Sequence, residues 1–370
     1  MSALRDRVDA LDHEMLSLLE RRMRLVSEIA AWKRAHGLRI RDSVREQQVL
    51  DDRAAVAEAL SLPRDAVESL FRVLMRASRD RQAALGAELP QDLPRYRVAV
   101  IGAAGGMGRL LVRLFAEWGQ TVLEVDRDTG LRAEDAAAGA DVTVVSVPIG
   151  DTEAVIRAVG PHVPDSGLLM DVTSLKEAPV AAMLASTRAS VVGTHPMFGP
   201  DVHSLQGQRV VLCRARGEAW AEWIARLFAA RGMTVIESTP DDHDRAMAVV
   251  QVLTHYQTQV LGLTLARAGT PVEETRRFSS PAYLLELVVT ARHFAQSAEL
   301  YGPIEMRNRR TAEITSAFRE AAADVAGILE RGDQEAFGAL FDEVRRYFHG
   351  FTEEALEQST HLIDRLVERA

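Results

Sequence analysis

The stretch that decides the fold spans residues 97–126 and reads RVAVIGAAGGMGRLLVRLFAEWGQTVLEVD. Residues 97–102 are almost all apolar, as in a buried strand, and glycines crowd the turn that follows. An amphipathic pattern then predicts a helix over residues 107–118, and a second apolar run ends on Asp126. This order predicts a dinucleotide site, in which backbone N–H groups at a helix N-terminus approach a pyrophosphate.

Apolar runs further along the chain extend this unit. They predict strands over residues 142–147, 167–171, 190–193, 209–213 and 234–237, and helical patterns separate several of them. Such alternation predicts an α/β Rossmann-like, doubly wound sheet. The expected cofactor-binding residues lie at the turn and at neighbouring strand ends: Gly102, Gly105, Gly106, Met107, Gly108, Asp126, Ser146 and Pro148.

The glycine turn departs from the common G-x-G-x-x-G pattern at one position. With Gly105 and Gly108 aligned, Ala103 stands where the first glycine belongs, and Gly102 is the candidate to replace it. The acid at Asp126 favours NAD, because it can bind a ribose hydroxyl. Arg127 beside it is an alternative contact for the 2′-phosphate of NADP, and a tight turn without a ligand is the structural alternative.

The residues before the sheet form a different kind of unit. Heptad-like apolar spacing predicts a long helix over residues 3–35, with Gly37 as its stop signal. A second helix to about residue 60 is capped by Asp42 or Ser43, the latter in a capping box with Glu46. A third runs over residues 64–84. Three helices this long cannot bury the first helix's apolar stripe, so a partner chain is expected.

The last third of the chain has no convincing strand pattern. From residue 241 to residue 370, amphipathic helical patterns are interrupted near Gly269-Thr-Pro271, Ser280-Pro281, Gly302-Pro303 and Gly332. With a linker over residues 85–96, we expect three domains: an all-α unit over 1–88, the nucleotide-binding domain over 97–240, and an all-α dimerisation domain over 241–370.

Composition narrows the class of protein. The 370 residues carry a net charge of −9, which gives no general attraction to nucleic acid or to anionic membranes. Cys213 is the sole cysteine, which excludes an intrachain disulfide and fits a reducing compartment. No apolar stretch approaches the ~20 residues of a membrane span, and the N-terminus lacks a signal-peptide pattern. A cytoplasmic globular protein is expected.

Polar residues at strand ends are the candidates for chemistry. His195 follows a predicted strand and is a natural base for a hydroxyl proton beside a nicotinamide; a loop-capping histidine is the alternative. Ser146 could orient the same hydroxyl, although strand-end serines are more often structural. Only two of the 44 basic residues are lysines, Lys33 and Lys176. Lys176 follows another strand end, and we expect it to face the same crevice.

Two cations in the first helix share one face. Arg22 and Lys33 are eleven residues apart and therefore differ by about 20° around the helix, in register with the apolar stripe. Inward cations without an acidic stripe favour an anionic ligand. The structural alternative to a ligand is that these side chains extend to solvent or form ion pairs with Asp or Glu on a neighbouring helix.

Taken together, these residues resemble the bifunctional chorismate mutase/prephenate dehydrogenases of tyrosine biosynthesis over essentially the whole chain. The helical unit is similar to chorismate mutases through Glu20-Arg-Arg22, Ala-Trp-Lys33, Asp42-Ser-Val-Arg45-Glu46 and Ser78-Arg-Asp-Arg-Gln82. The remainder is similar to prephenate dehydrogenases through Ser146-Val-Pro148, Asp171-Val-Thr-Ser-Leu-Lys176, Thr194-His-Pro-Met-Phe-Gly-Pro200 and Thr290-Ala-Arg292-His-Phe-Ala-Gln.

The resemblance implies two reactions and assigns residues to each. In the mutase, Arg5 and Arg22 bind carboxylates, Lys33 and Gln82 bind the ether oxygen, and Asp42, Arg45, Glu46 and Ser78 complete the pocket. In the NAD-dependent dehydrogenase, His195 takes the hydroxyl proton and Ser146 holds that hydroxyl. Its expected substrate contacts are Arg292, Lys176 and His255, the last matching a regulatory position at which tyrosine is expected to inhibit. No metal is implied.

Two other classes of protein stay open at this stage. One is another NAD-dependent hydroxyacid dehydrogenase with a helical dimerisation module in front. The other is a redox sensor that binds NAD without turnover, which leaves Arg22 and Lys33 unexplained. The mutase reading adds one geometric expectation. Arg5 and Arg22 are about 25 Å apart along a straight helix, so Arg5 must come from the partner chain of a homodimer.

Overall fold

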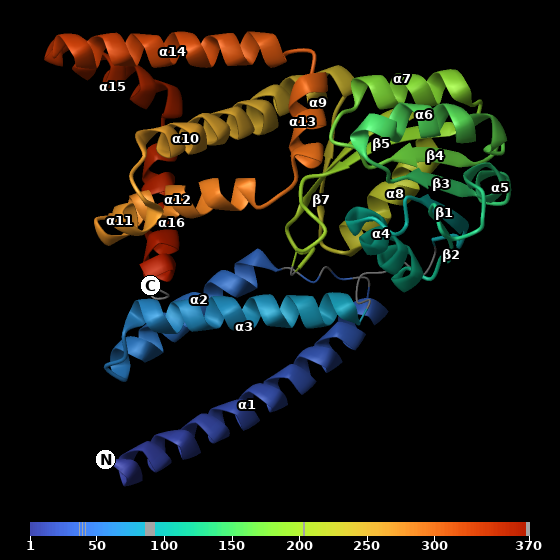
Figure 1. Cartoon of the computed structure of the whole chain (residues 1–370). Helices are drawn as coiled ribbons and strands as arrows, with labels where there is room; N and C mark the ends of the chain where they lie inside the picture. The colour runs from blue at the N-terminus through green and yellow to red at the C-terminus, as the bar shows by residue number, and fades with distance from the viewer. Residues whose placement is uncertain (37, 39, 41, 86–92, 203, 368–370) are drawn as a thin grey trace. The chain divides into compact units, whose positions relative to one another are not determined.

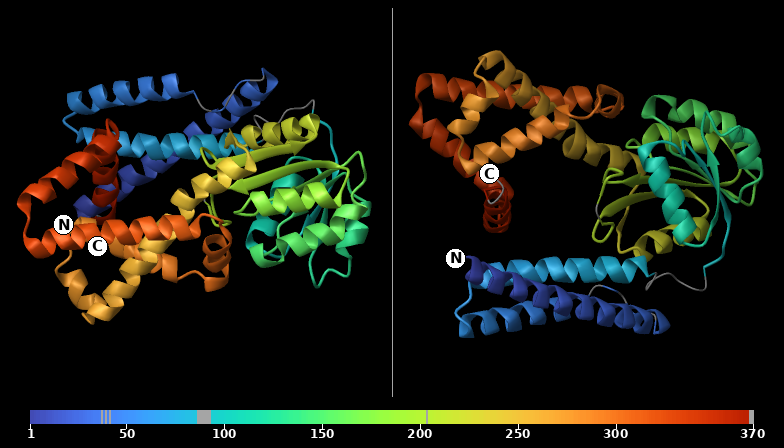
Figure 2. Two further views of the ribbon diagram at one scale, coloured as in Figure 1. Left: turned by 90° about the horizontal axis from the view of Figure 1, so that it is seen from above. Right: turned by 60° about the horizontal axis from the view of Figure 1, so that its bottom comes forward.

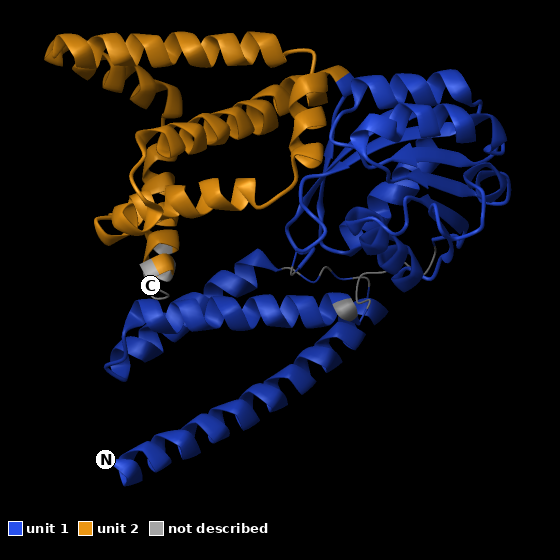
Figure 3. Cartoon of the chain, viewed as in Figure 1, with its two compact units in different colours: residues 1–240 blue, residues 241–370 orange. Residues whose placement is uncertain are grey.

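The computed structural model describes residues 1–36, 38, 40, 42–85, 93–202 and 204–367. It divides into two compact units, one formed by Met1–Pro240 and the other by Asp241–Ala370 (Figure 3). The expected stop at Gly37 and most of the expected linker over 85–96 lie outside the described residues. No helix among the described residues is long and apolar enough to span a membrane.

The first unit begins with three helices, as predicted (Figure 1). They are α1 (Ser2–Ala35), α2 (Ser43–Ala59) and α3 (Arg64–Ala84). Helix α3 packs against both α1 and α2. In α1 the structure buries only Val26 and Ala30, so most of its apolar stripe has no cover within this chain.

A seven-stranded sheet follows, in the spatial order β2-β1-β3-β4-β5-β6-β7. All seven predicted strands are present, and the α/β doubly wound class is confirmed. The bounds are β1 (Arg97–Ile101), β2 (Thr121–Val125), β3 (Val142–Val145), β4 (Leu168–Asp171), β5 (Ser190–Pro196), β6 (Arg209–Arg216) and β7 (Thr234–Glu237). The helices between them are α4 (Gly106–Glu117), α5 (Ala133–Ala138), α6 (Ile149–Val159), a 3₁₀ turn (Gly160–His162), α7 (Glu177–Ser186) and α8 (Glu218–Ala230).

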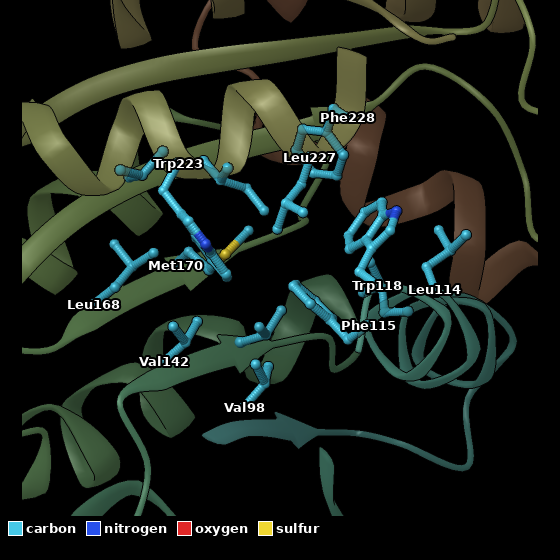
Figure 4. Packing of buried hydrophobic residues seen from close by; sticks show 14 of the residues in the cluster. Val98, Leu114, Phe115, Trp118, Val142, Leu168, Met170, Trp223, Leu227 and Phe228 are labelled. Atoms are coloured by element: carbon cyan, nitrogen blue, oxygen red, sulfur yellow. The ribbon is translucent and has the colours of Figure 1, made fainter. Parts of the chain in front are cut away.

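Both faces of the sheet are covered by helices (Figure 2). Val98 and Val100 of β1 join a core with α4 and α8, while Ala99 and Ile101 join a core with α5, α6 and α7. In the first core, Figure 4 shows aromatic side chains from α4 and α8 packed together, and the Trp118 and Phe228 rings are 6.0 Å apart. Apolar residues on both faces explain why these strands read as continuous hydrophobic runs.

The direction of β6 differs from that of its neighbour. It pairs antiparallel with β5, whereas all the other adjacent strands are parallel. Residues 197–208 connect β5 to β6 and contain no helix in their described part. A parallel neighbour is usually reached through a helical crossover, and a connection without a described helix fits the antiparallel return of the chain.

Every described secondary-structure element of the second unit is a helix. Its elements are α9 (Pro240–Met247), a π-helix (Ala248–Leu253), α10 (Thr254–Ala268), α11 (Val272–Arg277), α12 (Pro281–Phe294), α13 (Ala298–Arg307), α14 (Thr311–Arg331), α15 (Gln334–Phe348) and α16 (Phe351–Val367). Three of the predicted interruptions occur, at Gly269, Ser280 and Gly332.

The predicted break at Gly302-Pro303 is wrong, because Pro303 lies inside α13. Pro303 is the sixth of the ten residues of α13, so its missing N–H removes one hydrogen bond within the helix, to the carbonyl of residue 299. The chain instead breaks before α13, at Gln296 and Ser297, and after it, at Asn308 to Arg310.

Candidate active sites

The glycine turn is built around one close backbone approach. Gly102 has φ of +90°, and a Cβ there would lie 2.2 Å from the carbonyl oxygen of Ser146. A Cβ at Gly108 would lie 2.0 Å from the carbonyl oxygen of Gly102. Gly102 therefore adopts the positive φ that the turn requires, and Ala103 is buried with a φ outside that region. The turn keeps the open backbone that a pyrophosphate requires.

Asp126 lies where a ribose-binding acid is expected. Its carboxylate accepts hydrogen bonds from the N–H groups of Ala104, at 2.9 Å, and Arg127, at 2.8 Å. The acid at the end of β2 is thus tied to the glycine turn at the end of β1. This arrangement fits the adenosine half of NAD, whose ribose hydroxyls are recognised by such an acid.

The strand register brings the expected dehydrogenase residues to one edge. Ile101, Val145, Asp171 and Gly193 are at the same level in four adjacent parallel strands. Gly102, Ser146 and His195 follow at the carboxyl ends of their strands, which is where ligands bind in open α/β sheets. His195 itself belongs to β5, which runs three residues further than predicted.

His195 and Ser146 do not lie on neighbouring strands. Strand β4 separates them, so their backbones are about 10 Å apart, or two strand spacings. His195 is 3% exposed, and Ser146 is half-buried.

The loop after β5 leads from the histidine to the cofactor turn. A Cβ at Gly106 would lie 2.9 Å from Cγ of Pro200, so Pro200 packs directly on the first residue of α4. The segment from His195 to Pro200 therefore links the predicted base to the glycine turn that is predicted to bind the cofactor. The sequence placed Pro200 at the end of the motif that contains His195, but it did not predict this contact with α4.

Lys176 does not face a crevice, contrary to expectation. Its side chain is fully buried and forms an ion pair with the carboxylate of Asp171. Its ammonium also donates to the carbonyl oxygen of Thr194, at 2.7 Å. A side chain with no exposed surface cannot touch a substrate, so the expected substrate contact is corrected to a structural one. The sequence indicates that Lys176 follows a strand end, but not that its side chain turns inward to Asp171.

In the helical unit, α1 and α3 bring three predicted mutase residues together. Arg22 of α1 donates to Oγ of Ser78 at 2.6 Å, and Gln82 of α3 donates to the carbonyl oxygen of Ser78 at 3.3 Å. Burial lowers the pKa of the Arg22 guanidinium from its ordinary value. Oε1 of Gln82 is buried without a hydrogen-bond partner. Such an orphaned polar atom is one that a ligand or a second chain completes.

The face of α1 that carries these cations differs from the expected one. Arg22 and Lys33 lie half-buried on the side of Val26 and Ala30, which are buried. The stripe residues predicted beside them are 47–60% exposed: Leu4, Val8, Leu11, Met15, Leu18, Leu25 and Ile29. The expected single stripe is therefore two faces, one turned to α3 and one uncovered. Arg5 is exposed, near the start of the helix.

The remaining mutase candidates surround the start of α2. Lys33 donates to the carbonyl oxygen of Ile40 at 2.6 Å. Asp42 caps α2 by accepting from the N–H of Arg45 at 2.9 Å. The alternative capping box from Ser43 is not formed, because the Glu46 carboxylate pairs instead with Arg79 of α3, at 2.5 Å. Sequence reasoning missed Arg79, since an ion pair between two helices leaves no local pattern.

His255 and Arg292 belong to the second unit. The His255 ring lies 4.7 Å from that of Tyr301 and 5.4 Å from that of His293. Burial lowers the pKa of His255 to about 4 and raises that of the neighbouring Glu305. The 3.7 Å approach of His255 to Glu305 therefore joins a neutral imidazole to a carboxyl group rather than two charges. Arg292 of α12 is exposed.

Among the described residues, no group of three or more His, Cys, Asp or Glu side chains is placed to hold a metal ion. The donor groups at both sites are cations, hydroxyls, amides and an imidazole. They suit anionic organic ligands, and the fold and the strand-edge site define an NAD-dependent dehydrogenase preceded by a helical unit with an anion-binding cluster.

Comparison with known proteins identifies the family. Sequence models match chorismate mutase type II over residues 4–83, the nucleotide-binding domain of prephenate dehydrogenase over 120–237, and its dimerization domain over 239–343. The T-protein of Enterobacter agglomerans is 34% identical over 98% of this chain and 97% of its own length. That of Haemophilus influenzae is 32% identical over 97% and 95%. The chain belongs to the T-protein family, which joins a chorismate mutase domain to a prephenate dehydrogenase.

A solved structure shares the fold of the dehydrogenase part. The prephenate dehydrogenase of Aquifex aeolicus, in complex with hydroxyphenyl propionate and NAD+, is 18% identical with a TM-score of 0.58. The match covers 70% of this chain and 98% of that one.

Proposed function

We propose that the chain converts chorismate to prephenate in its helical unit and oxidises prephenate with NAD at the edge of its sheet. The product of the second reaction is 4-hydroxyphenylpyruvate. The observation that carries this proposal is the presence of two separate clusters in one chain. The first joins Arg22 to Ser78 and Gln82 in the helical unit. The second gathers His195, Ser146 and the glycine turn at the carboxyl ends of the strands. A hydroxyacid dehydrogenase with a dimerisation module, or a redox sensor, gives no role to the first cluster.

In the mutase reaction the residues act by shape and charge. The rearrangement of chorismate needs no covalent step, because a compact conformer and cations near its carboxylates and ether oxygen suffice. Arg22 and the partner's Arg5 are assigned to the carboxylates, and Lys33 and Gln82 to the ether oxygen. The pocket is completed by Asp42, Arg45, Glu46 and Ser78.

In the dehydrogenase reaction the chain moves a proton and holds an anion. NAD, when bound at the glycine turn, supplies the hydride acceptor. His195 accepts the proton of the 4-hydroxyl group, and Ser146 holds that hydroxyl in place. Arg292 binds the ring carboxylate, which leaves as carbon dioxide as the ring becomes aromatic. Aromatisation makes this loss downhill without a metal.

Each mutase site takes residues from two chains in this proposal. The seven stripe residues of α1 are about half exposed, and a second copy of the same helix, running antiparallel, would cover them. Within one helix, Arg5 and Arg22 are ~25 Å apart. In the antiparallel pair, Arg5 of one protomer instead lies beside Arg22 of the other. The dehydrogenase dimer would use the second unit, consistent with its match to a dimerization domain.

Complementation tests the shared site. Arg5→Ala and Arg22→Ala chains are each inactive alone, but a mixed dimer has one site with both lesions and one site with neither. With random pairing, half of the dimers are mixed, so about a quarter of wild-type mutase activity returns. Mixed dimers that are verified and yet inactive would show that Arg5 acts within its own chain or not at all.

Two further roles complete the proposal. Tyrosine, which shares the phenol of the product, inhibits the dehydrogenase at its substrate site with His255 nearby; an unshifted inhibition curve in His255→Ala would exclude that role.

The proposed domains are residues 1–88, 97–240 and 241–370, and the proposed location is the cytoplasm. Rates of NAD reduction with prephenate and with arogenate would show which of the two is the preferred substrate.

A further inference from the structure

Lys176 is fully buried, and it is one of only two lysines among the 44 basic residues of the chain. It occupies the N-cap position of α7, and its side chain has no exposed surface. Its ammonium joins the Asp171 carboxylate, at the end of β4, to the Thr194 carbonyl oxygen, in β5. The reaction proposed above gives it no contact with substrate, so another reason is needed for keeping a charge there.

The strand ladder explains what the ammonium does. The pairing of β4 with β5 ends at Asp171 and Gly193. Beyond that pair, the Thr194 hydroxyl donates to the Asp171 carbonyl oxygen at 2.6 Å, and Lys176 satisfies the Thr194 carbonyl. Side chains thus continue the connection between the two strands by one residue. Thr194 is fully buried, so its carbonyl oxygen needs such a partner.

The path of the lysine stem is equally constrained. A Cβ at Gly193 would lie 3.2 Å from Cδ of Lys176 and 2.6 Å from Cγ2 of Val180. The stem therefore passes over residue 193 because that residue has no side chain. A compact ammonium at the end of a thin stem fits this path, and the planar guanidinium of arginine is a different shape. The glycine at residue 193 and the lysine at residue 176 thus fit each other, and Gly193 lies one residue before Thr194 and two before His195.

We infer that Lys176 is a positioning residue for His195. By holding the Thr194 carbonyl against Asp171, it fixes the backbone at the end of β5, from which the imidazole projects. The inference rests on the proposed role of His195 as the base. A base must lie within hydrogen-bond reach of its proton, and a misplacement of about 1 Å costs on the order of 10²-fold in rate. Substrate affinity does not depend on this tether.

The test removes the tether without leaving a buried charge. Lys176→Met alone would strand the Asp171 carboxylate, so the variant is Asp171→Asn with Lys176→Met. We expect kcat for prephenate oxidation to fall at least about 30-fold, while KM for prephenate and Kd for NAD change less than about threefold. Thr143→Val is the matched control, because it removes a buried, unpartnered hydroxyl from β3 of the same sheet. It should leave kcat unchanged.

The decisive comparison repeats the double substitution in a His195→Asn background, in single-turnover experiments. If Lys176 acts through His195, the additional loss there is less than about threefold, because the base it positions is already absent. An equal loss in both backgrounds, an unchanged kcat, a raised KM or loss of NAD binding would each overturn the inference. Failure of wild-type protein to oxidise prephenate would instead overturn the proposed function.

Discussion

Substituting Gly102 by alanine separates two costs at the cofactor turn. The residue has φ of +90°, and a left-handed conformation costs a residue with a Cβ about 1–2 kcal/mol. The new Cβ would also lie 2.2 Å from the Ser146 carbonyl oxygen, so the ends of β1 and β3 must separate. Gly130 has φ of +69° and open space around it, which makes Gly130→Ala a control for the first cost alone.

We expect Gly130→Ala to lower the free energy of unfolding by about 1 kcal/mol and to leave NAD affinity within a few fold. Gly102→Ala should lower it by about 3 kcal/mol or more, a range reached by overpacking added to strain, and weaken NAD binding at least about 100-fold. Urea unfolding can be followed by the fluorescence of Trp118, Trp220 and Trp223, and NAD binding by calorimetry. Equal effects of the two variants on both quantities would refute the close approach as the basis of the turn.

Three other substitutions follow from the sites. His195→Asn should lower prephenate turnover ~10²–10⁴-fold while NAD binding and mutase activity survive; wild-type turnover would remove His195 from the chemistry. Arg292→Ala should raise KM for prephenate more than it lowers kcat, since a guanidinium on a carboxylate contributes ground-state binding; the reverse would give it a chemical role. His255, with its pKa near 4 against an ordinary 6.5, gives stability that is present above pH 6.5 and lost as pH falls toward 4. Between pH 7 and 5, the free energy of unfolding of the wild type should fall by about 2 kcal/mol more than that of His255→Gln. Glu305, whose pKa shift acts in the opposite direction, is present in both proteins, so its contribution cancels in the comparison. Parallel curves of unfolding free energy against pH would contradict the prediction.

The sequence predicted which segments are strands because their apolar runs are long and are bounded by glycines, prolines and acids. It did not predict the direction of β6, since apolar runs carry no direction and only the connection through residues 197–208 decides it. The helix through Pro303 was missed for a similar reason. A proline favours a break in the helix, but in α13 the helix continues through Pro303 with the loss of one internal hydrogen bond.

Candidate site residues were predicted where a motif places them at a strand end or along one helix. The sequence could not tell that Lys176 turns inward to Asp171, or that Glu46 pairs with Arg79 rather than capping α2. Both outcomes depend on elements that are distant along the chain. The surroundings of His255, which come from α12 and α13, are likewise set by packing and leave no local pattern.

A coupled assay that starts from chorismate tests the central claim most directly. With NAD present, the wild-type protein should form prephenate and then reduced cofactor, seen as rising absorbance, together with 4-hydroxyphenylpyruvate. Without NAD, or in His195→Asn, prephenate should accumulate. In Arg22→Ala, chorismate should remain unchanged while added prephenate is still oxidised. Consumption of chorismate in Arg22→Ala, or oxidation of prephenate in His195→Asn at the wild-type rate, would contradict the assignment of two separate sites on this chain.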